Sequence, residues 1–180
     1  SSCCPAFVKY IETKHPKMVE HISHNFSPMA ELGNHIKSRR KDAVVVFIGP
    51  CIAKKAEVRL DKVKKYVDYA ITFEELQALF DSKDIELKEL PWTDWNQASS
   101  YGRNFARAGG VAAAVEQMLK ELKVEDVEFN PISCDGIDKC KVALLKASKG
   151  VLPNNFIEGM ACVGGCIGGS GNLVRYEYSP

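Results

Sequence analysis

Residues 43–51 read AVVVFIGPC, an apolar and mostly β-branched run that ends at a glycine, a proline and a cysteine. Such a run, bounded by turn residues, is typical of a strand that is buried on both faces, as in a parallel sheet. Cys51 then follows the carboxyl end of this strand. Because open α/β sheets bind ligands outside that end, Cys51 is a candidate functional residue.

Strands and helices alternate along the rest of the chain. Strands are also expected at 68–73, 124–132 and 156–162, and a long loop at 87–107. Helices are expected at 5–15, 27–40, 73–80, 110–122 and 138–149. Thr72 is expected to cap the third of these helices through Glu75. This alternation predicts an α/β fold, a mostly parallel β-sheet flanked by helices.

Composition narrows the class of protein. The 180 residues include 46% hydrophobic and 26% charged residues, which predicts one globular domain over residues 1–180. The net charge of +1 suggests neither a nucleic-acid nor a membrane partner. No apolar run approaches the ~20 residues of a membrane span, and no signal-peptide pattern is present, so a cytoplasmic location is expected. The chain opens at Ser1 rather than Met, so we expect a fragment of a longer protein.

The seven cysteines are the most informative residues. They are Cys3, Cys4, Cys51, Cys134, Cys140, Cys162 and Cys166. An odd number argues against a fully paired disulfide framework, and a core of this size does not need one. Thiols with few clustered histidines or carboxylates favour an iron–sulfur or a zinc site.

Three short stretches place cysteine beside proline or glycine: SSCCPAF at 1–7, GPCIAKKAE at 49–57 and EGMACVGGCIGG at 158–169. A cubane cluster needs thiolates that converge from several loops, and glycines let the backbone approach it closely. The spacing leaves alternatives open, because the CxxxC pair could be half of a zinc site and all of the thiols could be structural. Cys134 and Cys140 are expected to be buried small hydrophobes.

The order and wording of these stretches resemble the catalytic domain of [FeFe]-hydrogenases. That family is marked by the signatures TSCCPxW, MPCxxKxxE and ExMxCxxGCxxGG. The resemblance spans almost the whole chain and implies one lobe of a two-lobed iron-only hydrogenase domain. It also implies a [4Fe-4S] cluster linked to a diiron subcluster with CO and cyanide ligands.

Residue roles follow from the matched positions. The resemblance implies that the cluster ligands are Cys4, Cys51, Cys162 and Cys166, the last also bridging to the diiron unit. The residues expected to take part in catalysis are Cys3 as proton relay, Lys54 as a donor to an iron cyanide, its signature partner Glu57, and Ser23 on the proton path. The residues expected at the cofactor are Met29, Met160, Gly164 and Gly165.

Departures from the signatures point to a subgroup. Gly49 stands where the family has Met, Met29 where it has Gln, and Phe7 where it has Trp. This wording looks closest to the sensory members that are linked to PAS domains. The resemblance also implies an N-terminal lobe and ferredoxin-like clusters, which are expected to be missing from this chain. It further implies an electron carrier such as ferredoxin and H2 as substrate.

The sequence therefore leaves one main hypothesis and two alternatives for the function. The parent protein, from an anaerobe, interconverts H2 with protons and electrons. Alternatively, it is an H2 or redox sensor with little turnover that is coupled to a signalling domain, or a non-catalytic scaffold for iron–sulfur assembly. The isolated lobe is expected to be inactive, because half of the cavity wall is missing.

Overall fold

The computed structural model describes residues 1–94, 97–124 and 126–174. Its elements, in chain order, are α1 (Pro5–Lys14), η1 (Pro16–His21), α2 (Pro28–Arg39), β1 (Val46–Ile48), α3 (Ala53–Glu57), β2 (Tyr69–Ile71), α4 (Phe73–Asp81), η2 (Leu87–Glu89), α5 (Ser100–Asn104), α6 (Gly110–Glu121), β3 (Pro131–Asp135), α7 (Ile137–Ser148), β4 (Phe156–Met160) and η3 (Cys166–Gly168).

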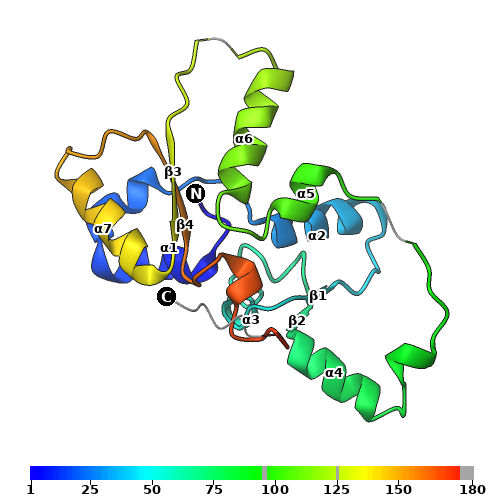
Figure 1. Ribbon diagram of the computed structural model, residues 1–180. Coiled ribbons are helices and arrows are strands. Elements are labelled where there is room, and N and C mark those ends of the chain that lie inside the picture. Colours follow the sequence, from blue (N-terminus) through cyan, green and yellow to red (C-terminus); the bar gives the residue numbers. More distant parts are fainter. Residues whose placement is uncertain (95–96, 125, 175–180) are drawn as a thin grey trace.

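The described strands form two separate parallel pairs. β1 pairs with β2 so that Val46 lies opposite Tyr69, and β3 pairs with β4 so that Cys134 lies opposite Gly159. Helices flank both pairs, with α1 and α7 beside β3 and β4, and α2, α3 and α4 around β1 and β2 (Figure 1). The predicted α/β fold with parallel strands and flanking helices is confirmed, although the strands do not form one continuous sheet.

The β3–β4 pair lies in the larger of two hydrophobic cores. Pro5 starts α1 at a position where a missing N–H costs nothing, and Phe7 and Ile11 follow at helical spacing. Both side chains are buried against Cys134 on β3 and Leu144 on α7. This core fixes the start of α1, and therefore Cys4, relative to the end of β4.

The second core lies between α2 and the segment that leads to β2. Met29 and Ala30 of α2 pack against Val63 and Val67. Ser27 caps α2 by accepting a hydrogen bond from the Ala30 N–H. This core is smaller, and it supports the β1–β2 pair.

Three expectations are wrong in detail. The strand at 43–48 is not buried on both faces, because Val46 and Ile48 are 44% and 43% exposed. The strand expected at 124–132 is observed as β3 at Pro131–Asp135, so the expected and observed strands share only two residues. The expected loop at 87–107 contains η2 and α5, whose start is capped by Ser99. Each error concerns tertiary packing or short local structure that hydrophobic patterning does not resolve.

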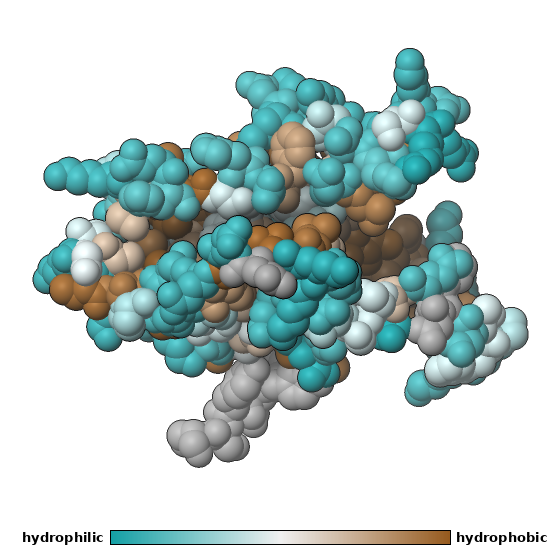
Figure 2. All heavy atoms as spheres, turned by 90° about the horizontal axis from the view of Figure 1, so that it is seen from above, coloured by the Kyte–Doolittle hydropathy of each residue, from teal (hydrophilic) through white to brown (hydrophobic). Residues whose placement is uncertain are grey.

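Polar side chains project around recesses in which apolar residues are exposed (Figure 2). By solvent exposure, the large hydrophobic side chains at the surface of the β1–β2 region include Val44, Val46 and Tyr69. Among the described residues, no helix is long and apolar enough to cross a membrane. The predicted cytoplasmic location stays a prediction.

Candidate metal centre

A cavity of about 280 Å³ brings the three cysteine stretches together. The cysteines that line it are Cys3, Cys4, Cys51, Cys162 and Cys166. Cys3 and Cys4 precede α1, Cys51 follows β1, and the other two follow β4. All five are free thiols in the structure. Segments up to 163 residues apart in the sequence thus supply thiols to one small space.

The loops that carry these thiols contact one another directly. The Gly171 N–H donates to the Pro50 carbonyl at 3.0 Å. At Gly169, an added Cβ would clash with the same carbonyl oxygen, so only glycine allows this approach. The glycine-rich loop after Cys166 is therefore packed against the turn that presents Cys51.

The loop from Cys162 to Cys166 is also tied to the end of β3. The Gly136 N–H donates to the carbonyls of Met160 and Cys162, at 2.9 Å and 3.1 Å. The Asp135 carboxylate accepts the Gly164 N–H at 2.7 Å. The neighbouring Lys139 and this N–H hold the pKa of Asp135 below its usual range. An ionised Asp135 thus anchors the cysteine loop.

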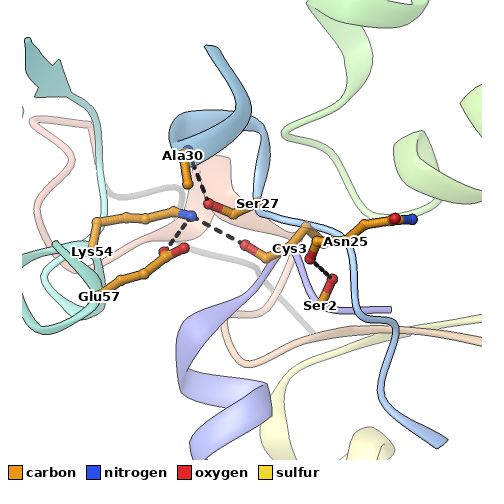
Figure 3. Close-up of polar contacts among 7 residues, drawn as sticks. All are labelled: Ser2, Cys3, Asn25, Ser27, Ala30, Lys54 and Glu57. Atoms are coloured by element: carbon orange, nitrogen blue, oxygen red, sulfur yellow. Dashed lines mark hydrogen bonds and ion pairs between the residues drawn. The ribbon is translucent and has the colours of Figure 1, made fainter. Parts of the chain in front are cut away.

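Lys54 and Glu57 form a buried ion pair beside the cavity (Figure 3). Their side chains are only 9% and 8% exposed, and Lys54 Nζ lies 2.7 Å from Glu57 Oε2. Lys54 also donates to the Cys3 carbonyl at 3.2 Å. Because Lys54 lines the cysteine cavity, its ammonium is placed to stabilise an anionic group there.

Burial governs the protonation of the cavity thiols. Desolvation raises the pKa of Cys3 and of Cys162, and it raises the pKa of Cys166 to about 12. The other cavity thiols add to the shift for Cys166, because a second nearby thiolate would repel the first. Free thiolates are therefore disfavoured, and bound iron would supply the positive charge that this donor set lacks.

The donor set has the make-up that a cubane cluster requires. Among residues 1–94, 97–124 and 126–174, no three His, Cys, Asp or Glu side chains lie close enough to hold one metal ion. A cubane cluster is a larger body that is held by four thiolates on different sides. Four cysteines from three segments around one cavity match that requirement.

The structure places the other predicted residues as follows. Met160 and Gly165 line the cysteine cavity. Ser23 lines a neighbouring cavity that Glu57 also reaches. Met29 lies in the second core, and Gly164 is held by Asp135. The roles assigned to these residues stay predictions.

Sequence reasoning missed two carboxylates at this centre, Asp135 and Glu158. The Asp-Gly dipeptide at 135–136 is a turn signal directly after a strand, and it could have identified Asp135. Glu158 stands in the third signature, but its position in a strand does not reveal its contacts. Cys134 and Cys140 are buried outside the cavity, as predicted.

Comparison with known proteins shows the family of the chain. The family described as "Iron only hydrogenase large subunit, C-terminal domain" matches residues 1–170. The chain belongs to this family. It is a hydrogenase-like iron–sulfur domain, and the match to the C-terminal lobe agrees with the order of the three cysteine stretches.

Curated relatives include hydrogenases and assembly factors. The chain is 30% identical to the periplasmic [Fe] hydrogenase large subunit of Nitratidesulfovibrio vulgaris, over 97% of this chain and 51% of that protein. It is 28% identical to the cytosolic Fe-S cluster assembly factor NAR1 of Kluyveromyces lactis, over 86% of this chain and 35% of that protein. The chain therefore spans about half or less of the length of these relatives.

Solved structures share the fold. The apo [FeFe]-hydrogenase HydA1 from Chlamydomonas reinhardtii superposes with a TM-score of 0.68 and 21% identity, over 98% of this chain and 62% of that chain. Another hydrogenase structure, which concerns stepwise H-cluster assembly, gives a TM-score of 0.66 and 20% identity over the same shares. At this identity, the likeness establishes the fold.

Proposed function

We propose that the chain is a cluster-binding lobe in which Cys4, Cys51, Cys162 and Cys166 hold a [4Fe-4S] cluster. The observation that carries the proposal is the convergence of these thiols on one cavity of about 280 Å³. Their separate backbone segments could surround a cubane, which no single helix could do. Family membership supports an iron–sulfur group over zinc.

The parent protein would interconvert H2 with protons and electrons. A diiron subcluster, for which Cys166 would be a ligand, would supply the chemistry of H2 binding and splitting, as the family resemblance implies. The chain's own residues would handle protons and charge. Cys3, whose pKa is raised by burial, keeps a proton on Sγ at neutral pH. Lys54, oriented by Glu57, presents N–H donors toward an anionic ligand in the cavity.

The rest of the machinery would come from outside these residues. A further lobe would complete the cavity wall, and ferredoxin-like clusters with an electron carrier such as ferredoxin would exchange electrons. Proton exit would pass from Cys3 toward Ser23, which lines the cavity next to Glu57. The expected location is cytoplasmic.

Two alternatives use the same site. An assembly scaffold is favoured by the likeness to NAR1. An H2 sensor coupled to a PAS or other signalling domain is favoured by Met29 and Gly49, which stand where the family has Gln and Met. Infrared spectra of the matured parent protein distinguish the assembly scaffold from a hydrogenase, because carbonyl and cyanide bands would exclude a scaffold. Measurement of H2 turnover together with a signalling output distinguishes the sensor from a hydrogenase.

Anaerobic reconstitution with iron and sulfide tests the proposal. We expect about four irons per chain and a low-temperature EPR signal from a reduced [4Fe-4S] cluster. Uptake of zinc, or no metal at all with the five thiols free, would contradict the ligand assignment. H2 turnover by the reconstituted chain alone would contradict the expectation that a further lobe completes the site.

A further inference from the structure

Glu158 is a buried charged residue for which the proposed chemistry has no use. Its residue exposure is 0%, and it occupies the middle of β4, four residues before Cys162. A buried carboxylate is costly unless donors surround it. The donors around Glu158 therefore indicate what it does.

Four donors converge on the Glu158 carboxylate. Oε1 accepts the N–H groups of Gly109 and Val111, at 3.1 Å and 3.3 Å. Oε2 accepts the Ala112 N–H at 3.1 Å and the Ser133 hydroxyl at 2.9 Å. The three N–H groups belong to the start of α6, which has no side-chain cap of its own. Glu158 thus supplies, from a neighbouring strand, the anion that a helix N-terminus attracts.

The start of α6 is in turn joined to the cysteine loop. The Ala108 N–H donates to the Gly164 carbonyl at 3.2 Å, and the Ile167 N–H donates to the Ala106 carbonyl at 3.3 Å. Arg107 and Gly165 form an antiparallel bridge between these bonds. Gly165 has φ +87°, and an added Cβ there would lie 2.6 Å from the Ala108 nitrogen. The backbone before α6 is therefore packed along the Cys162–Cys166 loop and bonded to it.

We propose that Glu158 is a positioning residue for the cysteine loop. Its carboxylate fixes the start of α6, and the segment 106–108 that enters α6 fixes residues 164–167, which include Cys166. The inference rests on the proposed function insofar as this loop holds a cluster. It goes beyond that function by assigning the loop's geometry to a carboxylate that does not line the cysteine cavity.

The chemistry of the site suggests a nearly isosteric test. Glu158→Gln keeps the volume and one acceptor oxygen, but its amide NH2 would face either the Ala112 N–H or the pair on Gly109 and Val111. At least one backbone donor would lose its partner. Glu116→Gln is the matched control, because Glu116 is an exposed residue of the same helix. Ser133→Ala is a milder variant that removes one of the four donors.

Amide exchange of the metal-free proteins and iron release from the reconstituted proteins give two readouts. In Glu158→Gln, the amides of Ala108 and Ile167 should exchange about tenfold faster than in the wild type. Iron should also pass to a chelator faster, and the EPR signal of the reduced cluster should change. Glu116→Gln should match the wild type in all three measurements.

Several results would overturn the proposal. Faster exchange limited to residues 109–112, with wild-type exchange at Ile167 and wild-type iron release, would make Glu158 a helix cap only. If Glu158→Gln does not fold, Ser133→Ala decides: a smaller acceleration at Ala108 and Ile167 supports the proposal, and no change contradicts it. Failure of the wild type to bind iron would refute the proposed function, while the exchange measurements would still test the positioning role.

Discussion

The two parallel strand pairs differ in how well they are buried. In the β3–β4 half, which comprises α1, β3, β4 and α7, the strands have five residues each and a core that includes Phe7 and Leu144. In the β1–β2 half, which comprises α2, β1, α3, β2 and α4, the strands have three residues, and Val46 and Ile48 are exposed. The β3–β4 half therefore has the longer and better buried strands.

The proposed cluster ligands are divided unequally between these halves. Cys4, Cys162 and Cys166 belong to the β3–β4 half, and Cys51 belongs to the other. A cluster held by all four would link the two halves covalently. The β3–β4 half would hold three of the thiolates in place. The β1–β2 half would complete the site by bringing Cys51 and Lys54 to it. The following predictions test this division.

The largest expected effect is loss of the Phe7 ring from the β3–β4 half. Phe7→Ala should lower the free energy of unfolding by about 3–5 kcal/mol, because the ring fills a fully buried space over β4. Val67→Ala in the β1–β2 half should cost less, about 1.5–3 kcal/mol, since a smaller buried side chain is truncated. Urea denaturation measures both. Equal losses would contradict the proposed difference between the halves.

The next effect concerns the buried ion pair of the β1–β2 half. Lys54→Met should destabilise the fold by about 3 kcal/mol, because it leaves the Glu57 carboxylate buried and unpaired. The chain offers a control with the same three-residue spacing, Lys64 with Asp61, whose side chains are 62% and 93% exposed. Lys64→Met should cost under about 1 kcal/mol. Similar values for the two variants would show that the buried pair is not tightly coupled.

A smaller effect is expected where Asp135 anchors the cysteine loop. Asp135→Asn weakens the bond to the Gly164 N–H, and it should cost about 1–2 kcal/mol of stability in urea denaturation. It should also speed iron release from the reconstituted protein. Lys139→Gln, which removes only the exposed partner of Asp135, should cost less stability than Asp135→Asn and should leave iron release unchanged. A Lys139 variant as damaged as Asp135→Asn would refute the anchoring role.

The smallest effect is a pH dependence in the β1–β2 half. Asp68 accepts from Lys37 at 2.8 Å and from the Val45 N–H at 2.7 Å, and these contacts hold its pKa below the ordinary 3.8. The unfolded chain therefore binds the proton first as the pH falls. The stabilisation is complete above pH 3.8 and is lost as the pH falls through the folded pKa.

Comparison of acid denaturation curves isolates this group. Asp68→Asn should lose stability at neutral pH, and its difference from the wild type should shrink as the pH falls below about 4. A difference that is the same at neutral and acidic pH would contradict the assigned pKa shift.

Local features of the fold could be predicted from the sequence. The capping box of Thr72 and Glu75 is present as expected, because its bonds span only three residues. The position of Cys51 after a strand is likewise a local property. Burial of the 43–48 run could not be predicted, because it depends on what packs over the strand. The run is apolar in sequence, and yet one face of β1 is exposed.

The carboxylates of the metal centre show the same limit. The three backbone donors to Glu158 lie 49, 47 and 46 residues away in the sequence, and the Ser133 hydroxyl lies 25 residues away, so no short motif contains the interaction. Cys134 and Cys140 were predictable as core residues because isolated cysteines are usually buried. The three stretches that place cysteine beside proline or glycine already suggest that thiols converge from several loops, and the family resemblance then implies which four cysteines would be ligands.

Iron content of two cysteine variants tests the central claim most directly. After anaerobic reconstitution, Cys166→Ala should fail to assemble a [4Fe-4S] cluster, because it removes a thiolate from the cavity. Cys140→Ala should retain about four irons per chain, as the wild type does, because Cys140 is buried outside the cavity among α1, β3 and α7. Equal loss of iron in both variants, or full iron in Cys166→Ala, would contradict the assignment of this cavity as the cluster site.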